Sequence, residues 1–204
     1  LACTSCSDSW LDLNPSTSVP TDQAFSSLED AQSALNGIYR LASAHSYYGD
    51  NFFYFGDCRA ADVQARMTKG DGRRVSPYYE YNVKATDSFN SSLPWNQVYK
   101  VIRQTNNLIA ATESGLIKTT DEAALNEIKA QALAMRGLAL YDLIRVFAMP
   151  YSYDNGQSLG VPIVTTATDQ SSKPARNTVA ECYDQIITDL TNSLAGLSKE
   201  KKDG

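Results

Sequence analysis

Histidine and cysteine are scarce in this sequence, which limits the chemistry that its side chains can perform. The 204 residues include one histidine, His45, and four cysteines, Cys3, Cys6, Cys58 and Cys182. A histidine-based catalytic triad or a histidine-rich metal site therefore lacks the residues it needs. We expect no metal and no cofactor, and we expect His45 to interact with the carbonyl end of a helix.

Cys3 and Cys6 have the C-x-x-C spacing of redox and zinc sites. Such a motif normally lies inside a fold, beside a second ligand pair or at a strand-to-helix junction. Here it stands ahead of a proline-containing, polar stretch that ends at Pro20. Redox chemistry is therefore not expected.

Long apolar runs and an excess of basic residues are also missing. No stretch of about 18 apolar residues is present, so the sequence predicts no membrane-spanning helix. The net charge is -5 and the pI is near 4.9, and the pair Arg73 and Arg74 is too short to form a basic patch. These values exclude a nucleic-acid surface. The sequence does not begin with methionine, and we expect it to start after a trimmed export signal.

The sequence does contain one long and strongly patterned helix between Thr119 and Pro150. Thr119 and Glu122 have the spacing of a capping box, and Pro150 marks the place where the helix must end. Its second half, residues 138–147, is apolar on almost every side and should be buried. Gly137 is small enough to let a neighbouring helix approach closely.

Two charged residues, Arg136 and Asp142, lie among the apolar residues of this helix. An unpaired charge in such surroundings would be costly. We therefore expect each of them to have a partner.

Four further helices are predicted from apolar residues at helical spacing, over 26–42, 51–67, 92–115 and 178–197. The predicted buried face includes Tyr39 in the first of them and Leu190 and Leu194 in the last. A connection of about six residues joins the helix over 92–115 to the long helix, which predicts an antiparallel hairpin. An apolar segment over 160–164 should pass along the core as extended chain. The predicted fold class is all-α, with tetratricopeptide-like helical hairpins and long irregular loops.

Capping signals predict where these helices begin. Ser26 with Glu29 and Thr178 with Glu181 have capping-box spacing, and Ser92 is a candidate N-cap. The Ser-Pro pair at 76 and 77 should exclude a helix, so that the tyrosines that follow lie on irregular backbone.

Seven short motifs follow one another in a specific order along the chain. They are Ser5-Cys6-Ser7-Asp8; Leu11-Asp12-Leu13-Asn14-Pro15; Leu35-Asn36-Gly37-Ile38-Tyr39; Trp95, Tyr99, Ile102 and Asn106; Arg136-Gly137 with Tyr141-Asp142-Leu143; Gly160-Val161-Pro162; and Arg176 with Thr178-Val179. The combination resembles the N-terminal half of the SusD/RagB family of nutrient-binding lipoproteins. Family members are commonly more than twice this long, so the resemblance implies an incomplete SusD-like helical domain.

The resemblance implies two parts, an N-terminal lipoprotein strap over residues 1–20 and a SusD-like, tetratricopeptide-like domain over residues 21–204. It implies that Cys6 is lipidated, with Cys3 as the alternative. It also implies a location on the outer-membrane surface, where the protein binds a glycan or similar oligomeric nutrient and delivers it to a SusC-like TonB-dependent transporter. The implied protein is not an enzyme.

The loop over residues 69–93 is where the resemblance implies glycan contacts. We expect Tyr79, Tyr81 and Asn82 to bind the ligand, with Arg73 and Asp71 behind them, and we expect their side chains to be exposed. Aromatic rings take the apolar faces of sugars, while amide and charged groups hydrogen-bond the hydroxyls. The opposing interpretation is that these tyrosines only cover the helical scaffold.

Two other classes of function are open on the sequence alone. Helical repeats bind peptides in concave grooves, so a protein-interaction module or scaffold without its own ligand site is the alternative. A glycosidase would need two carboxylates, for which Asp50, Asp57 and Asp62 are candidates by number only. Asp57 and Asp62 are instead expected to pair with Arg59 or Arg66.

Overall fold

The computed structural model describes residues 25–60, 76–82, 94–166 and 172–198. Regular structure in these residues is helical, with two isolated β-bridges and no strand. The long helices are α2 (Leu28–Ala42), α5 (Trp95–Glu113), α6 (Glu122–Phe147) and α7 (Val179–Leu194), and the shorter ones include α3 (Asn51–Arg59) and α4 (Ser76–Tyr79). The predicted all-α fold class is confirmed. None of the described helices is both long and apolar enough to cross a bilayer.

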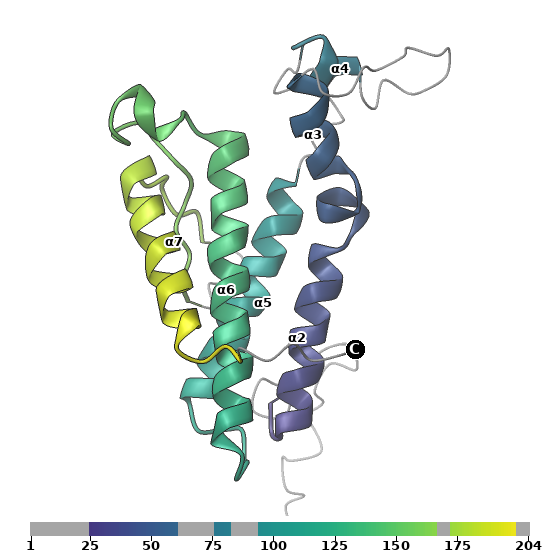
Figure 1. Cartoon of the computed structure of the whole chain (residues 1–204), viewed down its shortest axis with the longest axis vertical. Helices are drawn as coiled ribbons and strands as arrows, with labels where there is room; N and C mark the ends of the chain where they lie inside the picture. Colours follow the sequence, from purple (N-terminus) through teal and green to yellow (C-terminus); the bar gives the residue numbers. More distant parts are fainter. Residues whose placement is uncertain (1–24, 61–75, 83–93, 167–171, 199–204) are drawn as a thin grey trace, which may run out of the picture.

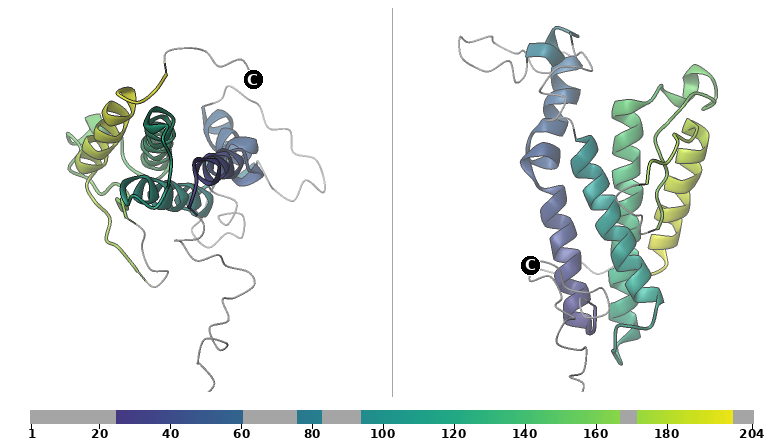
Figure 2. Two further views of the ribbon diagram at one scale, coloured as in Figure 1. Left: turned by 90° about the horizontal axis from the view of Figure 1, so that it is seen from below. Right: turned by 180° about the vertical axis from the view of Figure 1, so that it is seen from behind.

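The long helices stand side by side in a bundle (Figure 1). α5 and α6 run antiparallel and pack together, which confirms the predicted helical hairpin. α7 packs on α6 and α2 packs mainly on α5, so α2 and α7 lie on opposite sides of the bundle (Figure 2). α3 and α4 continue beyond α2 as an arm that extends past the bundle.

The start of α2 is fixed by a capping box one residue later than predicted. The hydroxyl of Ser27 accepts from the N–H of Asp30 at 3.2 Å, and the carboxylate of Asp30 accepts from the N–H of Ser27 at 3.0 Å. The predicted pair of Ser26 and Glu29 is therefore wrong, because the shorter aspartate reaches back to the cap from the third helical position. Tyr39, expected on the buried face of this helix, is 41% exposed.

The N-cap of α6 is a different residue from the one predicted, and the N-cap of α7 is the predicted one. Asp121 caps α6 by accepting from the N–H of Ala124 at 2.9 Å, so the predicted cap at Thr119 is wrong. Thr119 instead accepts from the N–H of Asp121 at 3.0 Å and so orders the residue that caps the helix. Thr178 and Glu181 form the capping box of α7 as predicted.

α5 begins at Trp95 with Pro94 at its N-cap, and the prediction of Ser92 as the cap is wrong. Ser92 lies outside the described residues. At the other end Gly115 has φ +71°, the left-handed conformation that a glycine after a helix provides.

The arm differs most from the prediction. α3 ends at Arg59, with Ala60 at its C-cap, well before the predicted end at Met67. Ser76 and Pro77 begin the one-turn helix α4 instead of excluding a helix. Proline is tolerated in a first turn because its missing N–H would have no intrahelical acceptor there.

α6 lies at the centre of the bundle, and most of its apolar residues are buried. A Cβ added at Gly137 would lie 3.1 Å from Cδ2 of Leu190 in α7, so the glycine permits the close helix contact that the sequence predicts. One face of α6 is open, because Leu138 and Tyr141 are each 36% exposed. The predicted burial on almost every side is wrong for that face.

Arg136 joins α6 to three other segments. Its Nε and Nη2 donate to Oδ2 and Oδ1 of Asp189 in α7 at 2.8 and 2.6 Å. Its Nη1 donates to Oδ1 of Asn106 in α5 at 2.9 Å and to the carbonyl of Thr165 at 3.2 Å. The prediction that Arg136 is paired is confirmed.

This ion pair also explains which face of α7 is buried. The buried residues of the helix are Val179, Cys182, Ile186, Asp189 and Ser193. Leu190 and Leu194, predicted on the buried face, are 40% and 72% exposed. The prediction is wrong for those two leucines because the face that carries Asp189 turns toward Arg136.

The segment over 160–164 passes along the core as extended chain, as predicted. The N–H of Gly160 donates to the carbonyl of Asn177 at 2.7 Å, and the N–H of Asn177 donates to the carbonyl of Val161 at 3.2 Å. The hydroxyl of Tyr99 donates to the carbonyl of Pro162 at 2.8 Å. Backbone groups of a buried loop need such partners.

Candidate functional site

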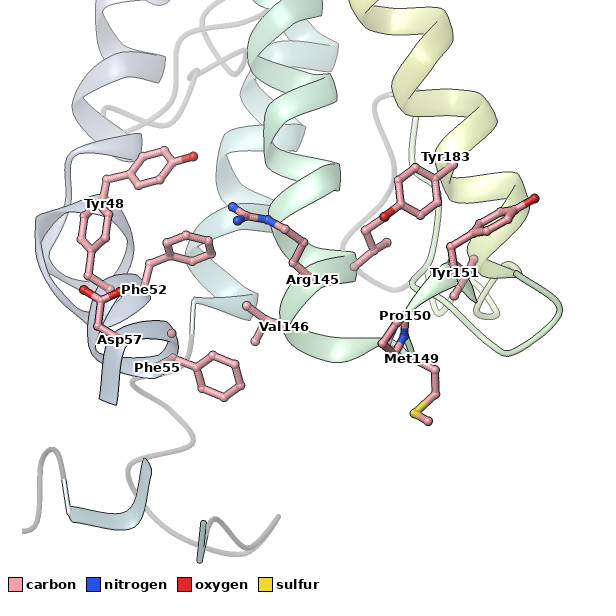
Figure 3. A pocket seen from close by; sticks show the side chains of 15 residues that line it. Tyr48, Phe52, Phe55, Asp57, Arg145, Val146, Met149, Pro150, Tyr151 and Tyr183 are labelled. Atoms are coloured by element: carbon pink, nitrogen blue, oxygen red, sulfur yellow. The ribbon is translucent and has the colours of Figure 1, made fainter. Parts of the chain in front are cut away.

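An open groove of about 710 Å³ lies between α3 of the arm and the neighbouring ends of α6 and α7 (Figure 3). Its volume is in the range of small-ligand sites. Arg145 and Asp57 are the two charged side chains among its described lining residues. Six aromatic residues also line it, Tyr48, Phe52, Phe53, Phe55, Tyr151 and Tyr183.

The arm side of the groove starts at a short π-helix, η2 (His45–Gly49), which leads into α3. Tyr47 has φ -131° and ψ -115°, which interrupts the helical backbone. The rings of Tyr47 and Tyr48 stack with centroids 4.2 Å apart, and the edge of Phe52 meets them at 5.7 and 5.5 Å. Stacked and edge-to-face contacts of this kind make a fixed aromatic cluster.

Asp142 of α6 joins the arm to the bundle. Its buried carboxylate accepts from the hydroxyl of Tyr47 at 2.6 Å, accepts from the hydroxyl of Tyr48, and pairs with Arg145. The predicted pairing of Asp142 is confirmed. Burial and the charge of Asp142 raise the pKa of Tyr47 above its usual value, and burial and the hydrogen bond to Asp142 raise the pKa of Tyr48 to about 12. Both hydroxyls therefore remain donors at neutral pH.

Arg145 extends from α6 toward the arm (Figure 3). Its Cζ lies 5.3 Å from the ring centroid of Phe52 and 4.6 Å from that of Tyr141, both cation–π distances. Burial acts to lower the pKa of Arg145, but the hydrogen bond and charge of Asp142 outweigh it and raise this pKa above its usual value. The guanidinium is a fixed, permanently charged group in the groove.

The opposite side of the groove is formed by α7 and the 3-10 helix η4 (Tyr151–Tyr153). The ring of Tyr183 meets the ring of Tyr151 edge-on at 5.6 Å, and Tyr151 is 46% exposed. Arg176 ties this segment to the end of α6. It donates to three backbone carbonyls, those of Phe147, Leu159 and Gly160, at 3.0, 2.9 and 2.5 Å.

The residues predicted to bind ligand lie on α4 and the turn that follows it. Tyr79 is 37% and Tyr81 is 67% exposed, and Asn82 is also exposed, which confirms the expected exposure of the two tyrosines. Their role in binding stays a prediction. Arg73 and Asp71 lie outside the described residues.

Contacts within the arm connect this predicted surface to the groove. Tyr81 has φ +54°, and its hydroxyl donates to the carbonyl of Arg59. The guanidinium of Arg59 stands 4.7 Å from the ring centroid of Phe55 and 5.7 Å from that of Tyr81. Tyr78 is only 2% exposed and meets Phe55 edge-on at 5.7 Å. Phe55 therefore lines the groove and supports α4.

Of the carboxylates considered for glycosidase chemistry, Asp57 lines the groove and Asp50 contacts His45. Nδ1 of His45 lies 2.8 Å from Oδ2 of Asp50, at the start of η2 and just after the end of α2 at Ala42. Its interaction with the carbonyl end of a helix stays a prediction. Asp57 lines the groove and has no ion pair with Arg59 in the described part of the chain, because Arg59 stacks on the arm aromatics. Asp62 lies outside the described residues, as do Cys3, Cys6 and the whole strap.

Residues 9–203 match a family model, SusD-like, described as starch-binding and associating with the outer membrane. The chain belongs to this SusD-like family. Within it, SusD-like protein P2 of Formosa agariphila is 32% identical over 190 residues, which cover 91% of the chain and 34% of that protein. The chain thus spans about a third of the length of the curated relatives it matches.

Solved structures of SusD-like proteins also match this chain. The crystal structure of a SusD superfamily protein from Bacteroides thetaiotaomicron is 65% identical with a TM-score of 0.82, and the match covers 87% of this chain and 39% of that one. A laminarin-binding SusD-like protein has a TM-score of 0.69 at 18% identity, with coverage of 88% and 36%. At that identity the second likeness shows a shared fold only.

In this SusD-like chain, reasoning from sequence missed the connection of Tyr47 and Tyr48 to Asp142 and Arg145. The tyrosines lie 95 and 94 residues away from the carboxylate along the chain, so no local pattern relates them. The one local signal was the spacing of three between Asp142 and Arg145, which suits an ion pair on a helix.

Proposed function

We propose that this SusD-like chain binds a glycan or a similar oligomeric nutrient in the groove between the arm and the bundle. The observation that carries the proposal is a groove of ligand size lined by six aromatic rings, a fixed guanidinium and a carboxylate. Aromatic faces stack on the apolar faces of sugar rings, and the charged groups hydrogen-bond the hydroxyls around them. The starch-binding description of the family supports the same ligand class.

The proposed site extends from the groove onto α4. Tyr79, Tyr81 and Asn82 are the proposed contacts there, with Arg73 and Asp71 behind them. Support comes from the exposure of the two tyrosines and from Phe55, which touches both regions.

We further propose that the chain binds its glycan without hydrolysing it. Glycoside hydrolysis uses two carboxyl groups, about 5 to 10 Å apart, on either side of the bond that breaks. Asp57 is the one carboxylate among the described residues that line the groove. A second acidic partner for catalysis is therefore missing from the described lining.

Calorimetric titration with a polysaccharide panel that includes laminarin and starch tests glycan binding. Phe53 lines the groove and is 47% exposed, so Phe53→Ala should remove a stacking surface and weaken binding about 5- to 150-fold. Leu194→Ala is the matched control, because Leu194 is 72% exposed on α7 and does not line the groove. Equal losses in both variants would contradict the site.

The proposal includes delivery of the nutrient to a SusC-like TonB-dependent transporter from the outer-membrane surface, with the protein held there by a lipid on Cys6. Acyl chains supply about 0.8 kcal/mol per buried CH₂. Cys6→Ala in the full precursor should release the protein from membranes, whereas Cys3→Ala should not. Membrane retention of the Cys6→Ala protein without lipid in its mass spectrum would contradict the anchor.

One observation favours the alternative, a protein-interaction module without its own glycan site. Ile187, Leu190 and Leu194 are 59%, 40% and 72% exposed, and their spacing places them on one face of α7. This function predicts that no polysaccharide in the panel binds. It also predicts that Leu194→Ala, and not Phe53→Ala, weakens association with the transporter.

A further inference from the structure

We infer that the groove takes neutral rather than acidic oligosaccharides, and that Asp142 is the residue that sets this preference. The inference rests on the proposed function, since it names the class of glycan that the same groove binds. Arg145 and Asp57 are the charged side chains among the described lining residues. Together with the buried Asp142, these two residues set the net charge that the groove presents to a ligand.

The positive charge of Arg145 is already matched inside the protein. The carboxylate of Asp142 is fully buried and accepts a hydrogen bond from Nη2 of Arg145. An acidic sugar that bound the remaining N–H groups of Arg145 would share that one positive charge with the buried Asp142, whose other partners are the hydroxyls of Tyr47 and Tyr48. Two carboxylates that share one guanidinium repel each other, so the net attraction of the site for an acidic ligand is small. Arg145 is therefore a poor counter-ion for a ligand.

The same geometry makes Arg145 a good donor to hydroxyl groups. Its guanidinium stands against the rings of Phe52 and Tyr141, so polar ligand atoms approach it along its edge. A guanidinium carries five N–H groups in one plane, and the described hydrogen bond to Asp142 uses one. The remaining N–H groups suit adjacent hydroxyl oxygens on a neutral sugar ring.

Asp57 adds a second negative charge on the arm side of the groove. It is exposed, lines the groove, and forms no ion pair with a described residue. With Asp142 and Asp57 against Arg145, the charges of the described residues at the groove sum to an excess of negative charge. A uronate or sulfate group would be repelled, whereas a neutral sugar would not.

The test compares laminarin and starch as neutral probes with polygalacturonate as the acidic probe, by calorimetry on the 204-residue chain at low salt. The wild type should bind a neutral probe, and its dissociation constant for polygalacturonate should be at least about tenfold higher. Asp142→Asn should free Arg145 and shift the ratio of affinities about tenfold toward polygalacturonate. A merely structural role for Asp142 would lower binding of both classes together.

Asp57→Asn is the second variant, and it keeps the test decisive if Asp142→Asn does not fold, because Asp57 is exposed. It should shift the ratio in the same direction. Glu29→Gln is the control, since it removes an equal charge from the exposed first turn of α2, away from the groove, and should leave both affinities unchanged.

Polygalacturonate binding as tight as that of the neutral probes would overturn the inference and leave the proposed function standing. An unchanged ratio of the affinities for the two probe classes in the folded Asp142→Asn and Asp57→Asn variants would also overturn the inference. If no polysaccharide of either class binds, the proposed function and the inference fall together.

Discussion

Arg136 of α6 and Asp189 of α7 form a bidentate ion pair across the contact between their helices, with N–O distances of 2.8 and 2.6 Å. The two side chains are only 10% and 1% exposed. The carboxylate also accepts from Gln185 at 2.9 Å, and the guanidinium reaches Asn106 of α5. This pair fixes the rotation of α7 on the bundle and so shapes one side of the groove.

The first prediction concerns that ion pair. Asp189→Ala should lower the free energy of unfolding by about 3–5 kcal/mol, because it leaves the buried guanidinium of Arg136 without its counter-ion. Chemical denaturation monitored by circular dichroism measures the change. The double substitution of Arg136→Met with Asp189→Leu should cost less than the single one, because no unpaired charge remains.

The matched control is the exposed ion pair of Lys129 and Glu113, with an N–O distance of 2.8 Å. The side chain of Lys129 is 34% exposed and that of Glu113 is 56% exposed. Glu113→Ala should cost less than about 1 kcal/mol. A loss from Asp189→Ala as small as that of Glu113→Ala would show that the buried pair does not hold α7 in place.

The second prediction concerns Gly137, where a Cβ would lie 3.1 Å from Cδ2 of Leu190. Gly137→Leu should overpack the contact between α6 and α7 and destabilise the protein by about 1–3 kcal/mol. The control is Gly37→Ala, because nothing lies within 4 Å of a Cβ at Gly37 in the middle of α2. That change should stabilise the protein by about 0.5–1 kcal/mol. A Gly137→Leu protein that melts like the wild type would contradict the close contact.

The third prediction concerns pH and Tyr48. The pKa of Tyr48 is raised from 10.0 to about 12 by burial and by its hydrogen bond to Asp142. A raised pKa contributes stability that is fully present below the unfolded value and is lost as the pH rises through the folded value. The free energy of unfolding should therefore fall between pH 10 and 12 less steeply in Tyr48→Phe than in the wild type. Denaturant titrations at several alkaline pH values test this, and equal slopes would count against it.

The fourth prediction concerns Tyr79 on α4. If its ring supplies stacking of about 1–3 kcal/mol, by analogy with stacking on nucleic-acid bases, Tyr79→Ala should weaken glycan binding about 5- to 150-fold. Its melting temperature should stay close to that of the wild type, because the side chain is 37% exposed. Calorimetry and thermal melting on the same sample give both values.

Tyr78→Ala is the contrasting variant, since Tyr78 is 2% exposed and packs on Phe55. It should lower the melting temperature. If Tyr79→Ala loses stability and binding together, Tyr79 belongs to the core of the arm and not to the ligand site.

The sequence by itself determined the four long helices and their order. The apolar spacing over 92–115 and 119–150 predicted the α5–α6 hairpin because helices of a bundle must bury one face. Thr178 and Glu181 predicted the start of α7, and the charges of Arg136 and Asp142 among apolar neighbours predicted that both are paired. These features depend on residues within a few turns of one another or on the cost of burying an unpaired charge.

Only the tertiary structure decided which residues pair with the buried charged side chains and which helix faces are buried. Apolar spacing predicted Leu190 and Leu194 on the buried side of α7, but the reach of Asp189 to Arg136 turned the helix away from that choice. The groove likewise depends on Tyr48 reaching Asp142 across 94 residues of chain. Contacts between distant segments are set by how whole helices pack, and a local pattern of residues does not contain that information.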